Sequence, residues 1–369
     1  MKIPQPSTTA NKAYTDRVSR RAVLWSLVGL GTAGLAGSSI VWLAHLHTAT
    51  AKTIMHPTQP TPTHSPLPTP IPVGTILRPY YGHFGYIYTV SWSPDSADIV
   101  SGSEDHTVHL WDAKTGADIL FTYSRHTDAV RAVAWSPDGT LIASGSMDTT
   151  VQIWKTSDES SVYTFTGHTD KVRTVAWSPD STLIASGSVD QTVLVWKAAT
   201  GEIITTYANH TNTVTSLAWS PDGTMVASAS ADKTVHVWKI TDGIDNVVYM
   251  NHTDAVNAVA WSPDSAFLAS ASSDKTVHIW KAADGTDLYT YQRHTDIVNT
   301  VTWSPDNLQV ASGGNDNTVQ IWDITNGSNS YTFQGHTDIV NAVAWSPDGT
   351  RIVSASNDKT ALVWLAIAL

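Results

Sequence analysis

A short unit that recurs seven times constrains this chain more than any other feature. From residue 83 onward, the histidine that opens each copy is followed by the next after 43 residues and then uniformly after 42. Two tryptophans per copy keep the same step. A repeat of this length indicates one small structural unit stacked many times. The seven histidines are His83, His126, His168, His210, His252, His294 and His336.

Each copy has the pattern of four short strands. In the second copy, an apolar run over 130–135 ends at a Ser-Pro-Asp-Gly turn, and a run over 141–146 ends at a turn that carries an aspartate. A segment over 150–155 alternates and is rich in β-branched residues, and a variable segment over 161–166 leads to the next histidine. Seven such units predict an all-β fold, a seven-bladed β-propeller of four-stranded antiparallel blades.

The last copy contains only three of the four strands. It ends at Leu369, so its outermost strand has to come from elsewhere in the chain. Because a propeller removes open sheet edges by closing on itself, we expect residues 75–81 to pair with the final strand at 360–367.

The copies resemble the WD-repeat family of β-propellers, over about residues 75–369. Gly-His occurs three times, as at Gly82-His83, whereas Trp-Asp survives only at Trp111-Asp112 and Trp322-Asp323. The resemblance implies a hydrogen-bonded tetrad of His, Ser, Asp and Trp that fastens the loops of each blade. The tetrads are His83/Ser101/Asp105/Trp111, His126/Ser144/Asp148/Trp154, His168/Ser186/Asp190/Trp196, His210/Ser228/Asp232/Trp238, His252/Ser270/Asp274/Trp280, His294/Ser312/Asp316/Trp322 and His336/Ser354/Asp358/Trp364.

The combination of Ser, His and Asp also resembles a hydrolase triad. Seven identical constellations, each joined to an indole, favour a role in the scaffold instead, and no other catalytic motif accompanies them. We therefore predict that the protein is not an enzyme and needs no cofactor or metal. Four further histidines, His106, His109, His236 and His278, are expected to be solvated.

Variation between the copies concentrates at three positions: three and five residues after the histidine, and one before the tetrad aspartate. The resemblance places these positions on the top face around the central channel, where partners dock. Tyr and Arg are favoured in protein interfaces, and clustered cations suit a ligand that carries a carboxylate. The predicted partner-binding residues are Tyr86, Tyr88, Glu104, Arg131, Met147, Lys171, Arg173, Asn257, Ile297, Asn299, Asn315, Ile339, Asn341 and Asn357.

The charge distribution bears on the partner. The formal net charge is -11, although residues 1–21 alone carry +4. An acidic body does not favour nucleic acid, so we expect a protein or peptide partner and a monomeric propeller that acts as a non-catalytic scaffold. Two alternatives remain open: a self-assembling structural surface protein and a propeller enzyme with its site at the channel mouth.

The N-terminal part predicts a tether. Residues 22–44 are uncharged, and 23 helical residues span about 34 Å, enough for a bilayer core of roughly 30 Å. Five basic residues precede this segment, which places the N-terminus in the cytoplasm and the propeller outside. We favour an uncleaved transmembrane anchor. The paired Arg20 and Arg21 resemble a twin-arginine signal, so the alternative is export with cleavage after Ala51.

The resulting domain prediction has four parts. Residues 1–21 form a basic cytoplasmic tail and residues 22–44 a transmembrane or signal helix. Residues 45–74 form a Pro/Thr-rich stalk, because frequent prolines favour an extended path that cannot build a core. Residues 75–369 form the propeller. A cytosolic scaffold whose N-terminus only resembles a membrane segment is the remaining alternative for location.

Overall fold

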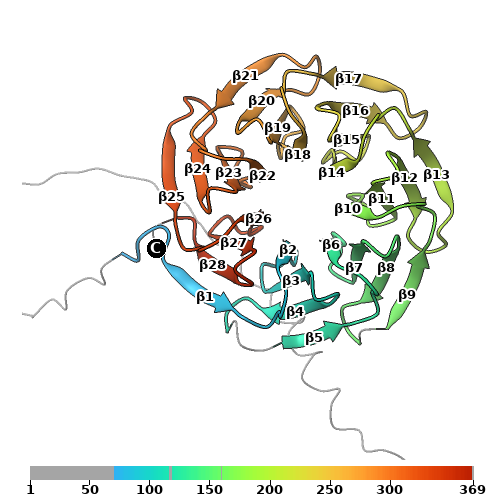
Figure 1. The fold of residues 1–369 in the computed structure, drawn as a ribbon, viewed down its shortest axis with the longest axis horizontal. Coiled ribbons are helices and arrows are strands. Elements are labelled where there is room, and N and C mark those ends of the chain that lie inside the picture. Colours follow the sequence, from blue (N-terminus) through green and yellow to red (C-terminus); the bar gives the residue numbers. More distant parts are fainter. Residues whose placement is uncertain (1–69, 116–118, 159, 368–369) are drawn as a thin grey trace, which may run out of the picture. The chain divides into compact units, whose positions relative to one another are not determined.

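The computed structural model describes residues 70–115, 119–158 and 160–367. These residues form seven four-stranded antiparallel sheets, arranged as blades around a central channel (Figure 1). The prediction of an all-β, seven-bladed propeller is confirmed. In the described part of the chain, no helix has the length and apolar character needed to cross a bilayer. The predicted tail, the predicted membrane helix and residues 45–69 of the stalk lie outside the described residues, so these domain boundaries stay predictions.

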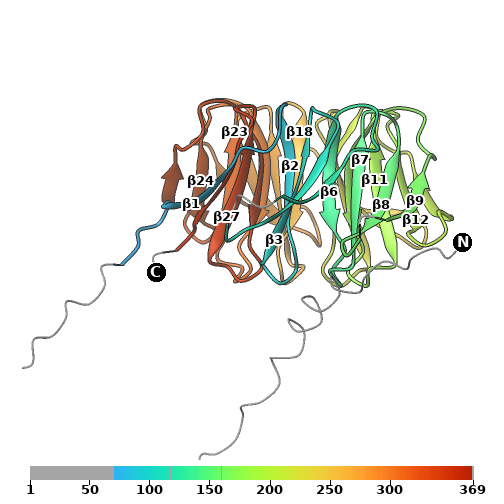
Figure 2. The ribbon, with the colours of Figure 1, turned by 90° about the horizontal axis from the view of Figure 1, so that it is seen from below.

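Each blade starts beside the channel and ends at the rim of the wheel, with its strands running between the two faces (Figure 2). Blades 1 to 3 are β2 (Ile87–Trp92), β3 (Asp98–Ser103), β4 (Val108–Asp112), β5 (Ile119–Tyr123); β6 (Val130–Trp135), β7 (Leu141–Ser146), β8 (Val151–Lys155), β9 (Ser161–Phe165); and β10 (Val172–Trp177), β11 (Leu183–Ser188), β12 (Val193–Lys197), β13 (Ile203–Tyr207). Blades 4 to 6 are β14 (Val214–Trp219), β15 (Met225–Ser230), β16 (Val235–Lys239), β17 (Asp245–Tyr249); β18 (Val256–Trp261), β19 (Phe267–Ser272), β20 (Val277–Lys281), β21 (Asp287–Tyr291); and β22 (Val298–Trp303), β23 (Gln309–Gly314), β24 (Val319–Asp323), β25 (Asn329–Phe333).

Blade 7 is built from both ends of the propeller. It consists of β26 (Val340–Trp345), β27 (Arg351–Ser356), β28 (Ala361–Leu365) and, as its outermost strand, β1 (Ile76–Tyr80). β1 lies antiparallel to β28, as Figure 1 shows, and the Gly74 N–H donates to the Leu365 carbonyl at 2.8 Å. The predicted closure of the ring by the segment that precedes the first copy is confirmed.

The Ser-Pro-Asp turn between the first two strands of each blade is fixed by its own side chains. In blade 2, the Asp138 carboxylate accepts hydrogen bonds from the Ser136 hydroxyl at 2.6 Å and the Thr140 N–H at 3.0 Å. The next position takes a left-handed conformation, with a φ of 74° at Gly139 and 60° at Ser96. Glycine, serine or asparagine at this position tolerates that conformation, which explains why the copies vary among these residues.

The core lies in the seams between neighbouring blades. Each tetrad tryptophan is fully buried and stacks on an aromatic ring from the outermost strand of the preceding blade, as Trp196 does on Phe165 with ring centres 4.2 Å apart. The residue two before the tryptophan matches that ring. It is His or Gln where the ring is Tyr, and Leu where the ring is Phe. Around the wheel the matched pairs are Tyr80/His109, Tyr123/Gln152, Phe165/Leu194, Tyr207/His236, Tyr249/His278, Tyr291/Gln320 and Phe333/Leu362.

The prediction that His109, His236 and His278 are solvated is wrong. All three are buried in the seams, where each contacts the hydroxyl of its matched tyrosine, as His109 Nδ1 does at 2.6 Å from Tyr80 Oη. Each imidazole also packs against a tetrad histidine. Burial and this neighbouring histidine lower the pKa of His109 and of His278 to about 4. His106 is exposed, as predicted.

Candidate functional site

The predicted tetrads are formed, and they lie inside the blades. In blade 2, His126 Nδ1 lies 2.8 Å from Asp148 Oδ2, and His126 Nε2 lies 2.8 Å from Ser144 Oγ. Although burial opposes it, the hydrogen bonds from His126 and Thr150 hold the pKa of the Asp148 carboxyl well below its usual range. All seven tetrad histidines are buried, which leaves their ring nitrogens engaged within the scaffold.

The last link of the tetrad is present in six blades and missing in one. In blade 5, for example, the Trp280 indole N–H donates to Ser270 Oγ at 3.1 Å. In blade 2, the buried Trp154 N–H has no partner among the described residues, and the Ser144 hydroxyl donates to the Gln152 carbonyl at 3.4 Å. The prediction of a complete tetrad is therefore wrong for blade 2.

Sequence reasoning missed a fifth member of this network. Two residues after each tetrad aspartate stands a threonine whose hydroxyl donates to the same carboxylate, as Thr150 does to Asp148 Oδ1 at 2.7 Å. The constancy of Asp-X-Thr in the copies was the available signal. The seven threonines are Thr107, Thr150, Thr192, Thr234, Thr276, Thr318 and Thr360.

The structure brings the three variable positions of each copy together on the face that carries the tetrad loops, called the top face from here on. In blade 1, the Glu104 N–H donates to the Tyr86 carbonyl at 2.9 Å, and the same bond recurs in every blade. Tyr86, Glu104 and Lys171 are exposed. The other predicted partner-binding residues are half-buried: Tyr88, Arg131, Met147, Arg173, Asn257, Ile297, Asn299, Asn315, Ile339, Asn341 and Asn357.

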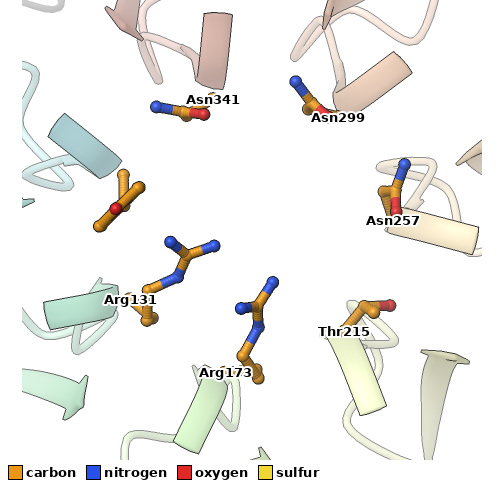
Figure 3. A pocket seen from close by; sticks show the side chains of 7 residues that line it. Arg131, Arg173, Thr215, Asn257, Asn299 and Asn341 are labelled. Atoms are coloured by element: carbon orange, nitrogen blue, oxygen red, sulfur yellow. The ribbon is translucent and has the colours of Figure 1, made fainter. Parts of the chain in front are cut away.

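One variable position from each blade lines the central channel. This position lies five residues after the tetrad histidine, near the start of the innermost strand. The seven side chains surround a cavity of about 170 Å³, and six of them are labelled in Figure 3. Among the described residues, no cluster of His, Asp or Glu is suited to a metal ion. The lining residues are Tyr88, Arg131, Arg173, Thr215, Asn257, Asn299 and Asn341.

The two sides of this ring differ in what their side chains do. In blades 4 to 7, the ring side chain donates a hydrogen bond to a backbone carbonyl of the next blade; we call these blades the bridged sector. In blades 1 to 3, the open sector, the structure shows no such bond from Tyr88, Arg131 or Arg173 within its described part. The four bridges run from Thr215 to Val256, Asn257 to Val298, Asn299 to Val340 and Asn341 to Ile87.

The open sector is strongly cationic at the channel. The Arg131 guanidinium carbon lies 3.8 Å from the centre of the Tyr88 ring, a cation–π contact. Burial and the positive charge of Arg131 lower the pKa of Arg173 to about 10, so Arg173 remains protonated at neutral pH. The Arg131 guanidinium is likewise a cation, because arginine is not deprotonated in proteins. Two like charges therefore face one small cavity.

Comparisons with known proteins agree with this architecture. A model described as the second β-propeller of echinoderm microtubule-associated protein matches residues 87–248. The model of the WD domain, G-beta repeat, matches residues 246–281, 285–323 and 327–364.

Curated relatives match only a short part of the chain. Eukaryotic translation initiation factor 3 subunit I from Botryotinia fuckeliana and from Sclerotinia sclerotiorum is 51% identical over 43 residues, which cover 12% of this chain and 13% of each relative. The same subunit from Neurospora crassa is 46% identical over 43 residues, 12% of either chain. The chain thus spans about an eighth of the length of these relatives. It contains WD40 repeats over residues 246–364, and its described residues form a seven-bladed β-propeller.

Proposed function

We propose that this protein is a non-catalytic interaction scaffold that binds a protein or peptide on the top face of its propeller. The observation that carries this proposal is the contrast between a constant frame and a variable ring. The His, Ser and Asp of the tetrad are hydrogen-bonded alike in all seven blades, whereas the channel-lining residues change from blade to blade and include two cations that form no hydrogen bond to the backbone of another blade among the described residues. Residues that vary in this way are better suited to binding a partner than to stabilising the fold.

The site chemistry supports a role without catalysis. The Ser, His and Asp of each tetrad are hydrogen-bonded to one another within the blade. An interpretation as a catalytic triad would require seven identical active sites in one chain. On the variable positions of the top face, Glu104 is the single carboxylate among the described residues. The similarity to a protein named as a subunit of an initiation factor also supports interaction with other proteins.

We extend the proposal to location, on the basis of the sequence alone. The uncharged segment at 22–44 would tether the propeller to a membrane, with the propeller outside the cytoplasm. Protease added to whole cells should then digest or release the propeller. Complete protection of a folded propeller would contradict an external location.

A pull-down with a charge-reversed channel tests the scaffold. We expect Arg131→Glu/Arg173→Glu to lose bound proteins that the wild type retains. The matched control is Lys155→Glu/Lys239→Glu, which reverses two exposed charges at the ends of β8 and β16. A captured protein counts only if it binds the purified protein directly. Retention of every bound protein by the channel variant would exclude this docking site, and a mass that rises with concentration would favour self-assembly instead.

A further inference from the structure

Two arginines project into the channel, and neither forms a hydrogen bond to the backbone of a neighbouring blade among the described residues. Arg131 on β6 and Arg173 on β10 come from adjacent blades, and Figure 3 shows both guanidinium groups pointing into the open centre. In the described residues, no carboxylate forms an ion pair with either one. Their charges repel each other across the cavity, and a bound anion would relieve that repulsion.

The cavity has room for a small group only. Its volume of about 170 Å³ is an order of magnitude above the roughly 10–15 Å³ that one water needs. A side chain or a chain end fits this space, whereas a helix about 10–12 Å wide does not.

The opposite wall of the channel does not compete for an anion. Asn299 and Asn341 use their Nδ2 donors to bridge the blades and to bond Asn315 and Asn357, both at 2.8 Å. This wall therefore offers acceptor oxygens rather than donors. The five ring residues other than the arginines are uncharged, which leaves the ring with an unbalanced charge of two.

We infer that the channel binds a single carboxylate group between Arg131 and Arg173. This inference rests on the proposed function and names the chemistry of the partner: an extended peptide that inserts either an acidic side chain or its C-terminal carboxylate. Guanidinium groups match the planar geometry of a carboxylate, and each oxygen can accept from one arginine. The more highly charged phosphate is less suited, because Glu104 stands on the adjoining rim and the whole chain has a net charge of -11.

The test uses three defined peptides on the full-length protein. These are acetyl-Gly-Gly-Glu-Gly-Gly-amide, its Gln counterpart, and acetyl-Gly-Gly-Gly with a free C-terminus. We expect the Nε–H signals of Arg131 and Arg173 in NMR spectra to shift with a carboxylate peptide and to stay in place with the Gln peptide. Whichever carboxylate peptide binds more tightly identifies the source of the group.

The variant for this test replaces both arginines with asparagine, a residue that already occupies the same ring position in other blades. Asn occupies this position in three blades, so Arg131→Asn/Arg173→Asn should fold with a melting temperature equal to or above that of the wild type. Because hydrogen bonds to charged groups are lost, carboxylate binding should weaken at least about tenfold. The control Lys239→Asn removes an exposed cation at the end of β16, outside the predicted partner-binding residues, and should change binding less than about twofold.

Three outcomes would overturn the inference. They are unmoved arginine signals with both carboxylate peptides, equal shifts with the Gln peptide, and tighter binding of inorganic phosphate than of either peptide. If any of these occurs while Arg131→Glu/Arg173→Glu still loses its partner, the carboxylate site is wrong and the scaffold proposal stands. If no protein binds the wild type directly, the scaffold proposal itself fails.

Discussion

The bridged and open sectors share one scaffold but use the same ring position differently. In blades 4 to 7 the side chain at this position joins its blade to the next, as Asn299 does at 3.0 Å from the Val340 carbonyl. In blades 1 to 3 the position carries Tyr88, Arg131 and Arg173, which form no such hydrogen bond among the described residues; Arg131 contacts the neighbouring blade through the Tyr88 ring instead. The ring position that joins neighbouring blades by a hydrogen bond in the bridged sector thus carries residues without that bond in the open sector.

The open sector also contains buried hydrogen-bond donors without partners in the described part of the chain, away from the channel. Two buried indole N–H groups lack a partner among the described residues, Trp135 and Trp154, and both belong to blade 2. The equivalent indole in blade 3, Trp177, donates to the Ala134 carbonyl at 3.1 Å. An unsatisfied buried donor costs about 1–3 kcal/mol, so blade 2 is the least stabilised blade by this criterion.

The largest effect is expected where the two sectors meet at the closure of the ring. Deleting residues 75–81 removes β1 and with it Tyr80, which stacks on Trp111 with ring centres 4.4 Å apart. Loss of a buried aromatic side chain alone costs about 3–5 kcal/mol, so the melting temperature should fall sharply. The control Ile76→Ser changes an exposed side chain of the same strand. An unchanged melting curve for the deletion would show that β1 does not hold the ring closed.

A pair of serine variants compares the tetrads of the two sectors. Ser270→Ala in blade 5 leaves both His252 Nε2 and the Trp280 N–H without a partner. Ser144→Ala in blade 2 leaves His126 Nε2 without a partner and otherwise removes only a long hydrogen bond, 3.4 Å, to the Gln152 carbonyl. Each orphaned group costs about 1–3 kcal/mol, so urea unfolding should show the larger loss for Ser270→Ala. Equal losses would mean that the indole link adds nothing to stability.

The stability should fall at acid pH through the seam histidines. The pKa of His278 is about 4 in the folded protein and about 6.5 when unfolded, so the unfolded state binds more protons between these values. The contribution of the neutral imidazole is therefore complete above about pH 6.5 and is lost as the pH falls towards 4. Tyr249→Phe/His278→Leu, which copies the Phe165/Leu194 seam, should lose less stability between pH 7 and 4.5.

The matched control for this pH dependence lies in the open sector. Tyr123→Phe/Gln152→Leu makes the same change at a seam where Gln152 stands in place of the seam histidine. Its unfolding free energy should vary with pH as in the wild type. A parallel change of slope in both double variants would assign the pH dependence to other groups.

The smallest effect tests the bridges themselves. Asn299→Ala removes one hydrogen bond between blades and should cost about 0.5–1.5 kcal/mol, whereas Arg131→Ala should have less effect on stability. Thermal unfolding of the two variants measures the difference directly. A greater loss for Arg131→Ala would show that the open sector depends on its arginines for folding.

The fold followed from the repeat in the sequence, whereas the resemblance to WD-repeat proteins implied the position of the variable residues. Four strand patterns per copy define the blades, and the variable residues lie at one register of those strands, so Tyr88 and Asn299 were correctly placed at the channel. The sequence did not predict that Asn299 forms a hydrogen bond between blades while Tyr88 does not, because the acceptor of Asn299 is a backbone carbonyl in another copy. His278 was misplaced for the same reason, since its partner Tyr249 lies across a seam.

The matched side-chain pairs at the seams have a consequence for which of the nearly identical copies pack against each other. If copies that are not neighbours packed together, Tyr would face Leu or Phe would face Gln at the seam. Each such mismatch would bury a polar atom without a partner, which costs about 1–3 kcal/mol of stability. Phe occurs at two seams and Tyr at five, so most exchanges of whole copies create such errors. The matched pairs therefore stabilise the native packing of neighbouring blades over packing between copies that are not neighbours, although the copies are otherwise nearly identical.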